Sequence, residues 1–250
     1  MTVAEPKPGE AHISTLEGRW GKVSVFNTDR YIGQSFLNYG EYNADETEFV
    51  VSLAQKAGKD KLVLDIGANI GAIGQALEHS GFTVESFEPQ PEVFNLLTRN
   101  VKGKCHNIAL ASRAGKTVMP KIRYDEVNNF GGISIGTTSK AHGGIEVQVE
   151  TLDSFNFQNV GLIKIDVEGF EEEVLRGAVN TIMRCSPILY LEDDRAEKSD
   201  SLYKFLTEIG YMWHVHRPPL YRDNNFFAKK ENIWGKNYVS KNIVCVKYPL

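Results

Sequence analysis

A glycine-rich turn at residues 67–71 is the part of the sequence with the clearest chemical content. The apolar segment Leu62–Ile66, which carries the acid Asp65, runs directly into this turn. Such a short apolar segment predicts a strand that is buried on both faces of a parallel sheet. Gly67 and Gly71 permit positive φ and a close approach of the backbone to a ligand, and the helix that follows directs its free N–H groups toward that ligand. The strand, turn and helix therefore predict a bound nucleotide or nucleoside.

The residues of the turn argue against a pyrophosphate ligand. A dinucleotide fingerprint has the pattern G-x-G-x-x-G, whereas here Asn69 occupies the middle glycine position and Gly71 follows at a different spacing. The Asp65 carboxylate would repel a pyrophosphate, but it can accept a hydrogen bond from the ammonium of an amino-acid tail, or it can orient the turn. The simpler alternative is a tight strand-to-helix turn with no ligand.

Glu88 lies at the end of the next predicted strand, Thr83–Phe87, and follows Asp65 by 23 residues. At this position a carboxylate can accept hydrogen bonds from both hydroxyls of a ribose. Pro89 and Pro91 would stiffen the turn that presents it. An isolated Glu is more often a solvated surface charge, but the spacing from the glycine turn favours ribose binding.

Asn107 lies near the end of the third predicted strand, Lys104–Ile108, where an adenine ring would follow the ribose. Its amide can contact the edge of the base, and the apolar residues Ile108, Ala109 and Leu110 can pack on the face of the ring. Asn at a strand end is also a common turn former. Both interpretations of Asn107 stay open.

Asp166 and Glu168 lie at the end of the predicted strand Leu162–Val167. This position is the carboxyl edge of the sheet, where open α/β folds bind their ligands. Carboxylates there can take a proton or hold a metal ion, so Asp166 and Glu168 are candidate catalytic residues. The alternative for Glu168 is a favourable interaction with the N-terminus of the helix expected over Phe170–Arg184.

Three consecutive acids, Glu192, Asp193 and Asp194, end the predicted strand Ile188–Glu192. With Asp166, these three acids can form a site for Mg²⁺ or Ca²⁺, which prefer carboxylate oxygens, and Asp193 and Asp194 are the first candidates among them. They can equally cap the next helix or remain solvated. A divalent metal is therefore an open alternative.

A polar cluster near the sixth predicted strand, Tyr211–Val215, is a further candidate for a substrate pocket. His214 can act as a general base because histidine titrates near neutral pH, although a single histidine is more often a surface or structural residue. The cluster comprises His214, His216, Arg217, Tyr221 and Arg222.

The alternation of strands and helices along the chain indicates an α/β fold with a mostly parallel sheet covered on both faces. The last two strands, Tyr211–Val215 and Ile243–Val246, have no helix between them and are expected to pair antiparallel. Two further strands, Thr117–Arg123 and Ile145–Glu150, predict an inserted β-hairpin with a long loop between them. A methyltransferase sheet ends with one reversed strand, whereas a dinucleotide-binding Rossmann sheet normally ends parallel.

The composition narrows the classes of partner. The chain has 250 residues, 42% of them hydrophobic, and a formal net charge of −4, which argues against a dedicated nucleic-acid binder. Cys105, Cys185 and Cys245 form no CxxC pair and predict free thiols in a reducing compartment. The sequence has no run of about 18 apolar residues, so we expect no membrane span and a cytoplasmic location.

Together these motifs resemble the FkbM family of S-adenosylmethionine-dependent methyltransferases. The resemblance extends over roughly residues 40–192. The residues that carry it are VLDIGANIGAIG (Val63–Gly74), SFEPQPEVF (Ser86–Phe94), NIAL (Asn107–Leu110), ETLDSF (Glu150–Phe155) and LIKIDVEGFEEEVLRGA (Leu162–Ala178).

The resemblance implies a Rossmann-like class I methyltransferase sheet of seven strands in the order 3-2-1-4-5-7-6. It implies S-adenosylmethionine as cofactor and, as acceptor, a hydroxyl on a sugar, polysaccharide or natural product. We expect an N-terminal extension with a short strand over 1–40 and one methyltransferase domain over 41–250. That domain would carry the insert at about 116–151 and a substrate-side loop at about 217–242. The residues implied to bind the cofactor are Asp65, Gly67, Asn69, Gly71 and Glu88, to which we add Asn107 and Asp166.

The expected chemistry is an in-line displacement at the sulfonium methyl, in which the protein mainly positions the acceptor. Asp166, Glu168 or His214 would take the hydroxyl proton, or a metal would acidify it. A nicotinamide-dependent oxidoreductase is disfavoured by the missing G-x-G-x-x-G and by the reversed last strand. A non-catalytic nucleoside-binding module is disfavoured by the intact glycine turn with Glu88 and Asp166.

Overall fold

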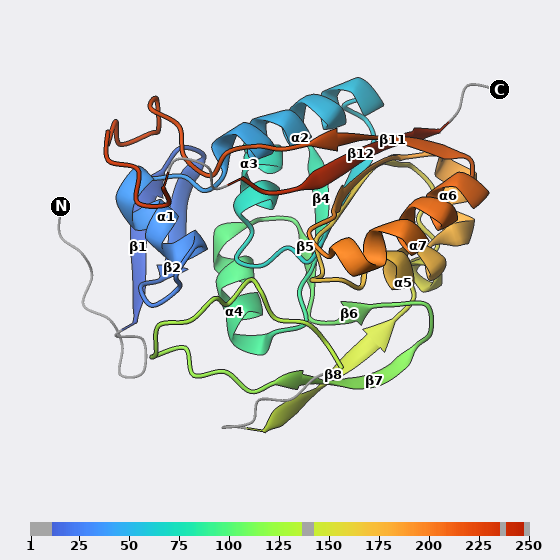
Figure 1. The fold of residues 1–250 in the computed structure, drawn as a ribbon, viewed down its shortest axis with the longest axis horizontal. Helices are drawn as coiled ribbons and strands as arrows, with labels where there is room; N and C mark the ends of the chain where they lie inside the picture. Colours follow the sequence, from blue (N-terminus) through green and yellow to red (C-terminus); the bar gives the residue numbers. More distant parts are fainter. Residues whose placement is uncertain (1–11, 137–142, 236–238, 248–250) are drawn as a thin grey trace.

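A mostly parallel sheet forms the centre of the computed structural model, which describes residues 12–136, 143–235 and 239–247 (Figure 1). Within these residues the sheet has seven strands in the order β11-β12-β10-β9-β3-β4-β5. Their bounds are β3 (Leu62–Ile66), β4 (Thr83–Phe87), β5 (Lys104–His106), β9 (Val160–Ile165), β10 (Ile188–Glu192), β11 (Tyr211–His216) and β12 (Asn242–Lys247).

The topology confirms the predicted fold class. Numbered along the chain, the seven described strands of this sheet have the order 3-2-1-4-5-7-6. Strand β12 runs antiparallel to both neighbours, β10 and β11, whereas β10, β9, β3, β4 and β5 are parallel. In the register of the central strands, Lys164 lies opposite Asp65. This pairing places the ends of β3 and β9 beside each other at the carboxyl edge.

Helices cover both faces of the sheet, as Figure 1 shows. Val63, Val84 and Leu162 pack with α2 and α3 on one face, and Leu64 and Ile163 pack with α5, α6 and α7 on the other. This alternation of side chains follows the period of two that a strand imposes. The helices of the described residues are α1 (Ile32–Tyr39), α2 (Ala44–Ala57), α3 (Ala72–His79), α4 (Pro91–Asn100), α5 (Glu171–Arg176), α6 (Val179–Cys185), α7 (Ala196–Glu208) and the short 3-10 helix η1 (Leu152–Phe155).

The helix predicted over Phe170–Arg184 is instead two helices, α5 and α6, with a break at Gly177. A Cβ at Gly177 would overlap the carbonyl oxygen of Ala111, so the chain approaches its neighbour here as only glycine allows. Asp153 then starts α6 by accepting hydrogen bonds from the backbone N–H groups of Asn180 (3.0 Å) and Thr181 (2.8 Å). Tertiary contacts therefore override the helical periodicity.

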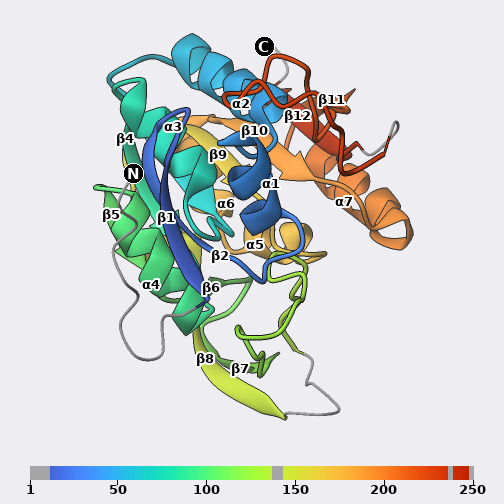
Figure 2. The same cartoon turned by 90° about the vertical axis from the view of Figure 1, so that its left-hand side faces the viewer.

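The N-terminal segment, for which one short strand was expected, forms an antiparallel hairpin of two strands, β1 (Ile13–Gly18) and β2 (Gly21–Phe26). Figure 2 shows this hairpin packed against α4. The side chain of Asn100 in α4 accepts a hydrogen bond from Ser24 N (2.7 Å) and donates to Ser24 O (2.9 Å) and Ile70 O (2.7 Å). The hairpin is thus linked to the glycine turn through the side chain of Asn100.

A smaller sheet follows the third strand of the main sheet. The strand predicted over Lys104–Ile108 ends at His106, and β6 (Ala109–Leu110) pairs parallel with β8 (Gly144–Glu150). As predicted, β7 (Gly115–Pro120) and β8 pair antiparallel. Among the described residues, no helix is long and apolar enough to cross a membrane.

Candidate functional site

A cavity of about 670 Å³ opens at the carboxyl ends of β3, β4, β9 and β10. This is the edge at which α/β sheets bind ligands. The cavity walls combine the glycine turn, the turn after β4, the segment Ile108–Leu110, the acids after β9 and β10, and parts of α2 and of the two long loops. The polar residues that line it include Asn69, Glu88, Asp166, Glu168, Glu192, Asp194, Glu46, Lys164, Arg195 and Asn242.

The glycine turn requires its glycines. Gly67 has φ of +73°, and a Cβ there would overlap the carbonyl oxygen of Asp166. Gly71, at the start of α3, has φ of +88°, and a Cβ there would lie 2.7 Å from Val101 Cγ1. Gly67 N and Ala68 N both donate to the carbonyl oxygen of Phe87 at 3.0 Å. The turn is therefore fixed between the ends of β4 and β9, with its backbone bordering the cavity.

Asp65 is fully buried beneath the turn rather than on the cavity wall. Its carboxylate lies 3.3 Å from Lys164 Nζ, which also donates to Gly67 O (3.0 Å) and lies 3.5 Å from Asp166 Oδ2. Burial lowers the pKa of Lys164, but the carboxylates of Asp65 and Asp166 outweigh it and raise the pKa above its usual value. Asp65 thus orients the turn through a charged lysine.

Glu88 lies where the spacing predicted, buried at the end of β4 and on the cavity wall. One carboxylate oxygen accepts from Asn69 N (3.0 Å) and the other from Gln90 N (2.9 Å). Burial raises the pKa of Glu88 to about 7, although these N–H groups and Lys164 act in the opposite direction. Each oxygen keeps a lone pair for a further donor.

Asn107 is exposed and lies outside the cavity lining. Its amide donates to the carbonyl oxygens of Glu88 (2.9 Å) and Pro89 (3.1 Å), so it holds the turn that presents Glu88. The residues after it, Ile108–Leu110, do line the cavity. The structure therefore gives Asn107 the turn-forming role that was the alternative at this position.

Asp166, Glu168 and Glu192 converge at the ends of β9 and β10, with one carboxylate oxygen of each within 4.8 Å of the others. Glu168 has φ of +55° and forms an ion pair with Arg195. Burial raises the pKa of Glu168 to about 7, with a further contribution from Asp166 and Asp194. Burial and the neighbouring acids Asp166 and Glu168 raise the pKa of Glu192 well above its usual value.

Asp193 does not join this group. It is buried and accepts hydrogen bonds from Ser199 Oγ (2.5 Å) and Tyr203 OH, and Lys241 Nζ lies 2.7 Å away. Consecutive side chains of an extended segment point to opposite sides, so Glu192 and Asp194 border the cavity while Asp193 faces away. The first candidates expected from the sequence, Asp166, Asp193 and Asp194, are therefore not brought together, whereas Glu192, the other acid of that run, does lie beside Asp166.

His214 is exposed on β11 and is not part of the cavity lining. Two strands, β12 and β10, separate β11 from β9, whose end carries Asp166. His216 stacks near Phe49 (ring centroids 4.1 Å apart) and hydrogen-bonds Tyr190 OH (2.9 Å). We therefore do not retain His214 as a candidate base.

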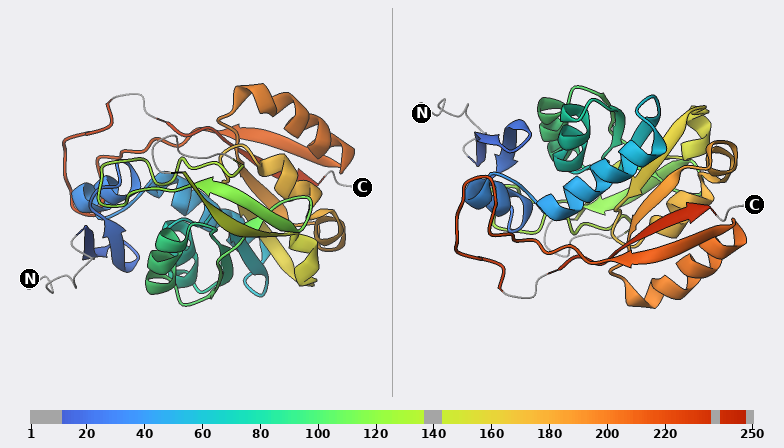
Figure 3. Two further views of the ribbon diagram at one scale, coloured as in Figure 1. Left: turned by 90° about the horizontal axis from the view of Figure 1, so that it is seen from below. Right: turned by 90° about the horizontal axis from the view of Figure 1, so that it is seen from above.

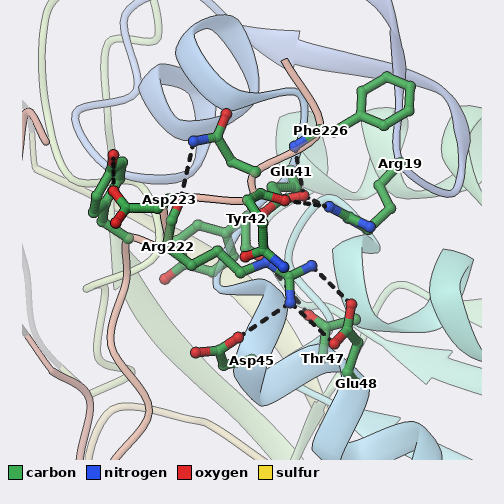
Figure 4. Close-up of polar contacts among 12 residues, drawn as sticks. Arg19, Glu41, Tyr42, Asp45, Thr47, Glu48, Arg222, Asp223 and Phe226 are labelled. Atoms are coloured by element: carbon green, nitrogen blue, oxygen red, sulfur yellow. Dashed lines mark hydrogen bonds and ion pairs between the residues drawn. The ribbon is translucent and has the colours of Figure 1, made fainter. Parts of the chain in front are cut away.

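Arg222, from the same predicted cluster as His214, anchors the segment between β11 and β12 to the start of α2. Figure 4 shows its guanidinium bound to Glu41 (3.0 Å), Asp45 (3.1 Å) and Glu48 (2.7 Å) around the start of α2. Figure 3 shows the same segment running beside α1, where Phe227 N donates to Tyr39 O at 3.0 Å. These contacts fix a strap whose ends, at Leu220 and residues 239–242, line the cavity.

Lys164 and Glu46 line the cavity but were not among the predicted site residues. Lys164 is the lysine inside the otherwise apolar, fully buried strand β9, and this burial pattern is the signal that marks it. Glu46 falls on the apolar face of α2, four residues before Val50, and is buried against the cavity. Burial and the Asp166 carboxylate raise the pKa of Glu46 to about 8. An acid on the apolar face of a helix is therefore as much a candidate site residue as an acid at the end of a strand.

The fold and the site define a Rossmann-like class I methyltransferase. The chain is similar in fold to the tRNA (uracil-54, C5)-methyltransferase of Pyrococcus abyssi in complex with S-adenosyl-L-homocysteine, with a TM-score of 0.51 and 10% identity. The match covers 94% of this chain and 44% of the other. Residues 65–213 match the methyltransferase FkbM domain. The chain belongs to the FkbM methyltransferase family, which confirms the resemblance.

Two curated relatives cover different shares of the chain. The hexuronic acid methyltransferase AglP of Haloferax volcanii is 27% identical in an alignment of 202 residues, and the match covers 75% of this chain and 78% of the relative. The 31-O-demethyl-FK506 methyltransferase FkbM of Streptomyces tacrolimicus is 30% identical in an alignment of 152 residues, and the match covers 46% of this chain and 58% of the relative.

Proposed function

We propose that this protein transfers a methyl group from S-adenosylmethionine to a hydroxyl of a carbohydrate or natural-product acceptor. The observation that carries the proposal is the single cavity in which the glycine turn and Glu88 face Asp166. The names of the two curated relatives give a hexuronic acid and 31-O-demethyl-FK506 as their acceptors. We assign the activity to residues 41–250, with residues 1–40 as an extension.

The residues that line the cavity fit S-adenosylmethionine. Glu88 offers two carboxylate oxygens, each already held by a backbone N–H, to the two ribose hydroxyls. Ile108 and Leu110 offer an apolar wall for the adenine. The acids of the cavity outnumber its lysines and arginines, which favours a cationic sulfonium and ammonium group over a pyrophosphate.

When bound, S-adenosylmethionine supplies a methyl group activated by the positive charge on sulfur, so the protein has to position the acceptor and remove its proton. The Asp166 side chain is 38% exposed to the cavity and is held by Lys164 at 3.5 Å. We assign it the role of general base toward the acceptor hydroxyl. Glu168 is tied to Arg195 and shapes the same wall.

The function is tested by adding S-adenosylhomocysteine or NAD in a thermal-shift assay, and then by transfer of labelled methyl to a panel of sugars, sugar acids and macrolides. Stabilisation by S-adenosylhomocysteine alone, with label in an alkali-stable ether, is the expected result. Stabilisation by NAD instead would favour the oxidoreductase, and binding of neither would favour the non-catalytic module. Label lost on mild alkali would identify a carboxylate acceptor and overturn the hydroxyl assignment.

Cofactor affinity is expected to rise with pH through about 7 and to level off above it, since protonation of Glu88, whose pKa is about 7, removes one acceptor for the ribose hydroxyls. Glu88→Gln should weaken S-adenosylhomocysteine binding by about 10- to 100-fold, the loss of one or two charge-assisted hydrogen bonds, and should flatten this step. Calorimetric titrations between about pH 6 and pH 8.5 measure both effects.

The matched control is Glu85→Gln. Glu85 lies on the same strand but bonds His106 at 2.7 Å, outside the cavity lining. It should keep both the affinity and the pH profile of the wild type. Equal affinities for the Glu88 variant and the wild type would remove Glu88 from the cofactor site.

A further inference from the structure

We propose that Asp166, Glu168 and Glu192 bind one divalent cation of the hard, oxygen-liganded kind, such as Mg²⁺ or Mn²⁺, at the acceptor side of the cavity. The binding of the ion stands on the side chains themselves, and only its role in catalysis rests on the proposed function. Of the acids that the sequence offered beside Asp166, this set keeps Glu192 and leaves out Asp193, which faces away, and it gains Glu168.

The three carboxylates come from adjacent strand ends. Ile165 and Leu191 are paired in the register of β9 and β10, so Asp166 and Glu192, which follow them, emerge side by side. The left-handed φ of +55° at Glu168 turns the chain back, and its carboxylate joins the other two. Opposite oxygen ligands lie about 4.2 Å apart around Mg²⁺ and about 5 Å apart around Ca²⁺. The observed spread of up to 4.8 Å therefore needs only small side-chain rotations to enclose an ion.

Glu192 supplies a second, independent observation. Its Oε2 atom is buried at the cavity wall and has no hydrogen-bond partner in the described part of the chain. A buried carboxylate oxygen without a donor is costly, and a cation is the partner that would offset this cost. Neither neighbouring basic residue reaches it: Lys164 is bound to Asp65, Gly67 O and Asp166, while Arg195 pairs with Glu168 and Asp194.

The charged residues around these three acids also favour a bound cation. Glu46 faces this part of the cavity from α2 and Asp194 from the end of β10, so the local carboxylates outnumber Lys164 and Arg195. Lys241, also on the wall, is already paired with Asp193 at 2.7 Å. A divalent ion would reduce this excess of negative charge.

An ion at this position would lie beside Asp166, on the side of the cavity where the acceptor hydroxyl must approach. It would bind that hydroxyl and ease the loss of its proton to the free oxygen of Asp166. The hydroxyl oxygen then forms the new bond to the methyl carbon, while the carbon–sulfur bond breaks and its electron pair stays on sulfur.

The test is calorimetric titration of the EDTA-treated full chain with MnCl₂ alone, without cofactor or acceptor. We expect one Mn²⁺ site in the wild type and an affinity at least tenfold weaker in Glu192→Gln. The control is Glu197→Gln, which removes an exposed acid from the start of α7 and should leave Mn²⁺ binding unchanged. Thermal melting with and without Mn²⁺ checks folding. If Glu192→Gln does not fold, Glu168→Gln, which alters another ligand of the same set, takes its place and should show the same loss.

Absence of a Mn²⁺ site in the wild type, or equal affinity of the ligand variant and the Glu197→Gln control, would overturn the inference. Titration with S-adenosylhomocysteine on the same samples separates the two proposals. Mn²⁺ binding without cofactor binding would keep the metal site and remove the proposed function, and the reverse would remove only the metal site.

Discussion

Asp166→Asn is expected to lower the turnover number for methyl transfer by about 100- to 10,000-fold, the range that removal of a general base produces, and to leave the affinity for S-adenosylhomocysteine within about threefold. Asparagine keeps the shape of the side chain and one carbonyl oxygen, but it cannot accept the hydroxyl proton. Glu88, on the cofactor side of the cavity, keeps its hydrogen bonds, and Lys164 keeps its partner Asp65 beneath the glycine turn. Steady-state kinetics combined with calorimetry measure the two effects separately.

The control for Asp166→Asn is Asp200→Asn, an exposed acid on α7, which should turn over as the wild type does. A wild-type turnover number for Asp166→Asn would eliminate Asp166 as the base. A large loss of cofactor affinity instead would show that Asp166 acts by holding the cofactor, the other role expected from the sequence.

The parts of the site that lie within one motif could be predicted from the sequence. Gly67 and Gly71 lie where their spacing placed them, because a strand-turn-helix fixes its own geometry over a few residues. Glu88 lies at the same edge because it directly follows the neighbouring parallel strand β4. The reversed β12 followed from the missing helix between the last two strands, whereas the order of the sheet was implied by the resemblance to the FkbM family.

Contacts between distant segments could not be predicted in this way. The turn-holding hydrogen bonds of Asn107 depend on how β5 meets the end of β4. The break at Gly177 depends on the approach of Ala111 from another sheet. Glu46 enters the cavity because the apolar face of α2 packs on β3 and β9. In each case the position is set by packing, which a period of 2 or 3.6 residues does not encode.

Gly67→Ala is expected to be the most destabilising of the single substitutions considered, lowering the free energy of unfolding by about 3–5 kcal/mol. Two costs add. A non-glycine residue at φ of +73° is strained by about 1–3 kcal/mol. The new Cβ must also displace the carbonyl oxygen of Asp166, and with it the end of β9. Urea unfolding measures the loss, and binding of S-adenosylhomocysteine should fall with it because Glu88 and Lys164 both bond the displaced turn.

Gly81→Ala separates the two costs. Gly81 has a similar φ of +87°, but nothing lies within 4 Å of the position its Cβ would take. The Gly81→Ala variant should therefore lose only the free energy that the positive φ costs, about 1–3 kcal/mol, and should keep its cofactor affinity. The difference between the two variants measures how tightly the turn is packed against the end of β9. Equal destabilisation by Gly67→Ala and Gly81→Ala would show that the glycine turn can move away from the end of β9. Glu88 and Asp166 would then have no fixed relative position, and the proposed chemistry depends on that position.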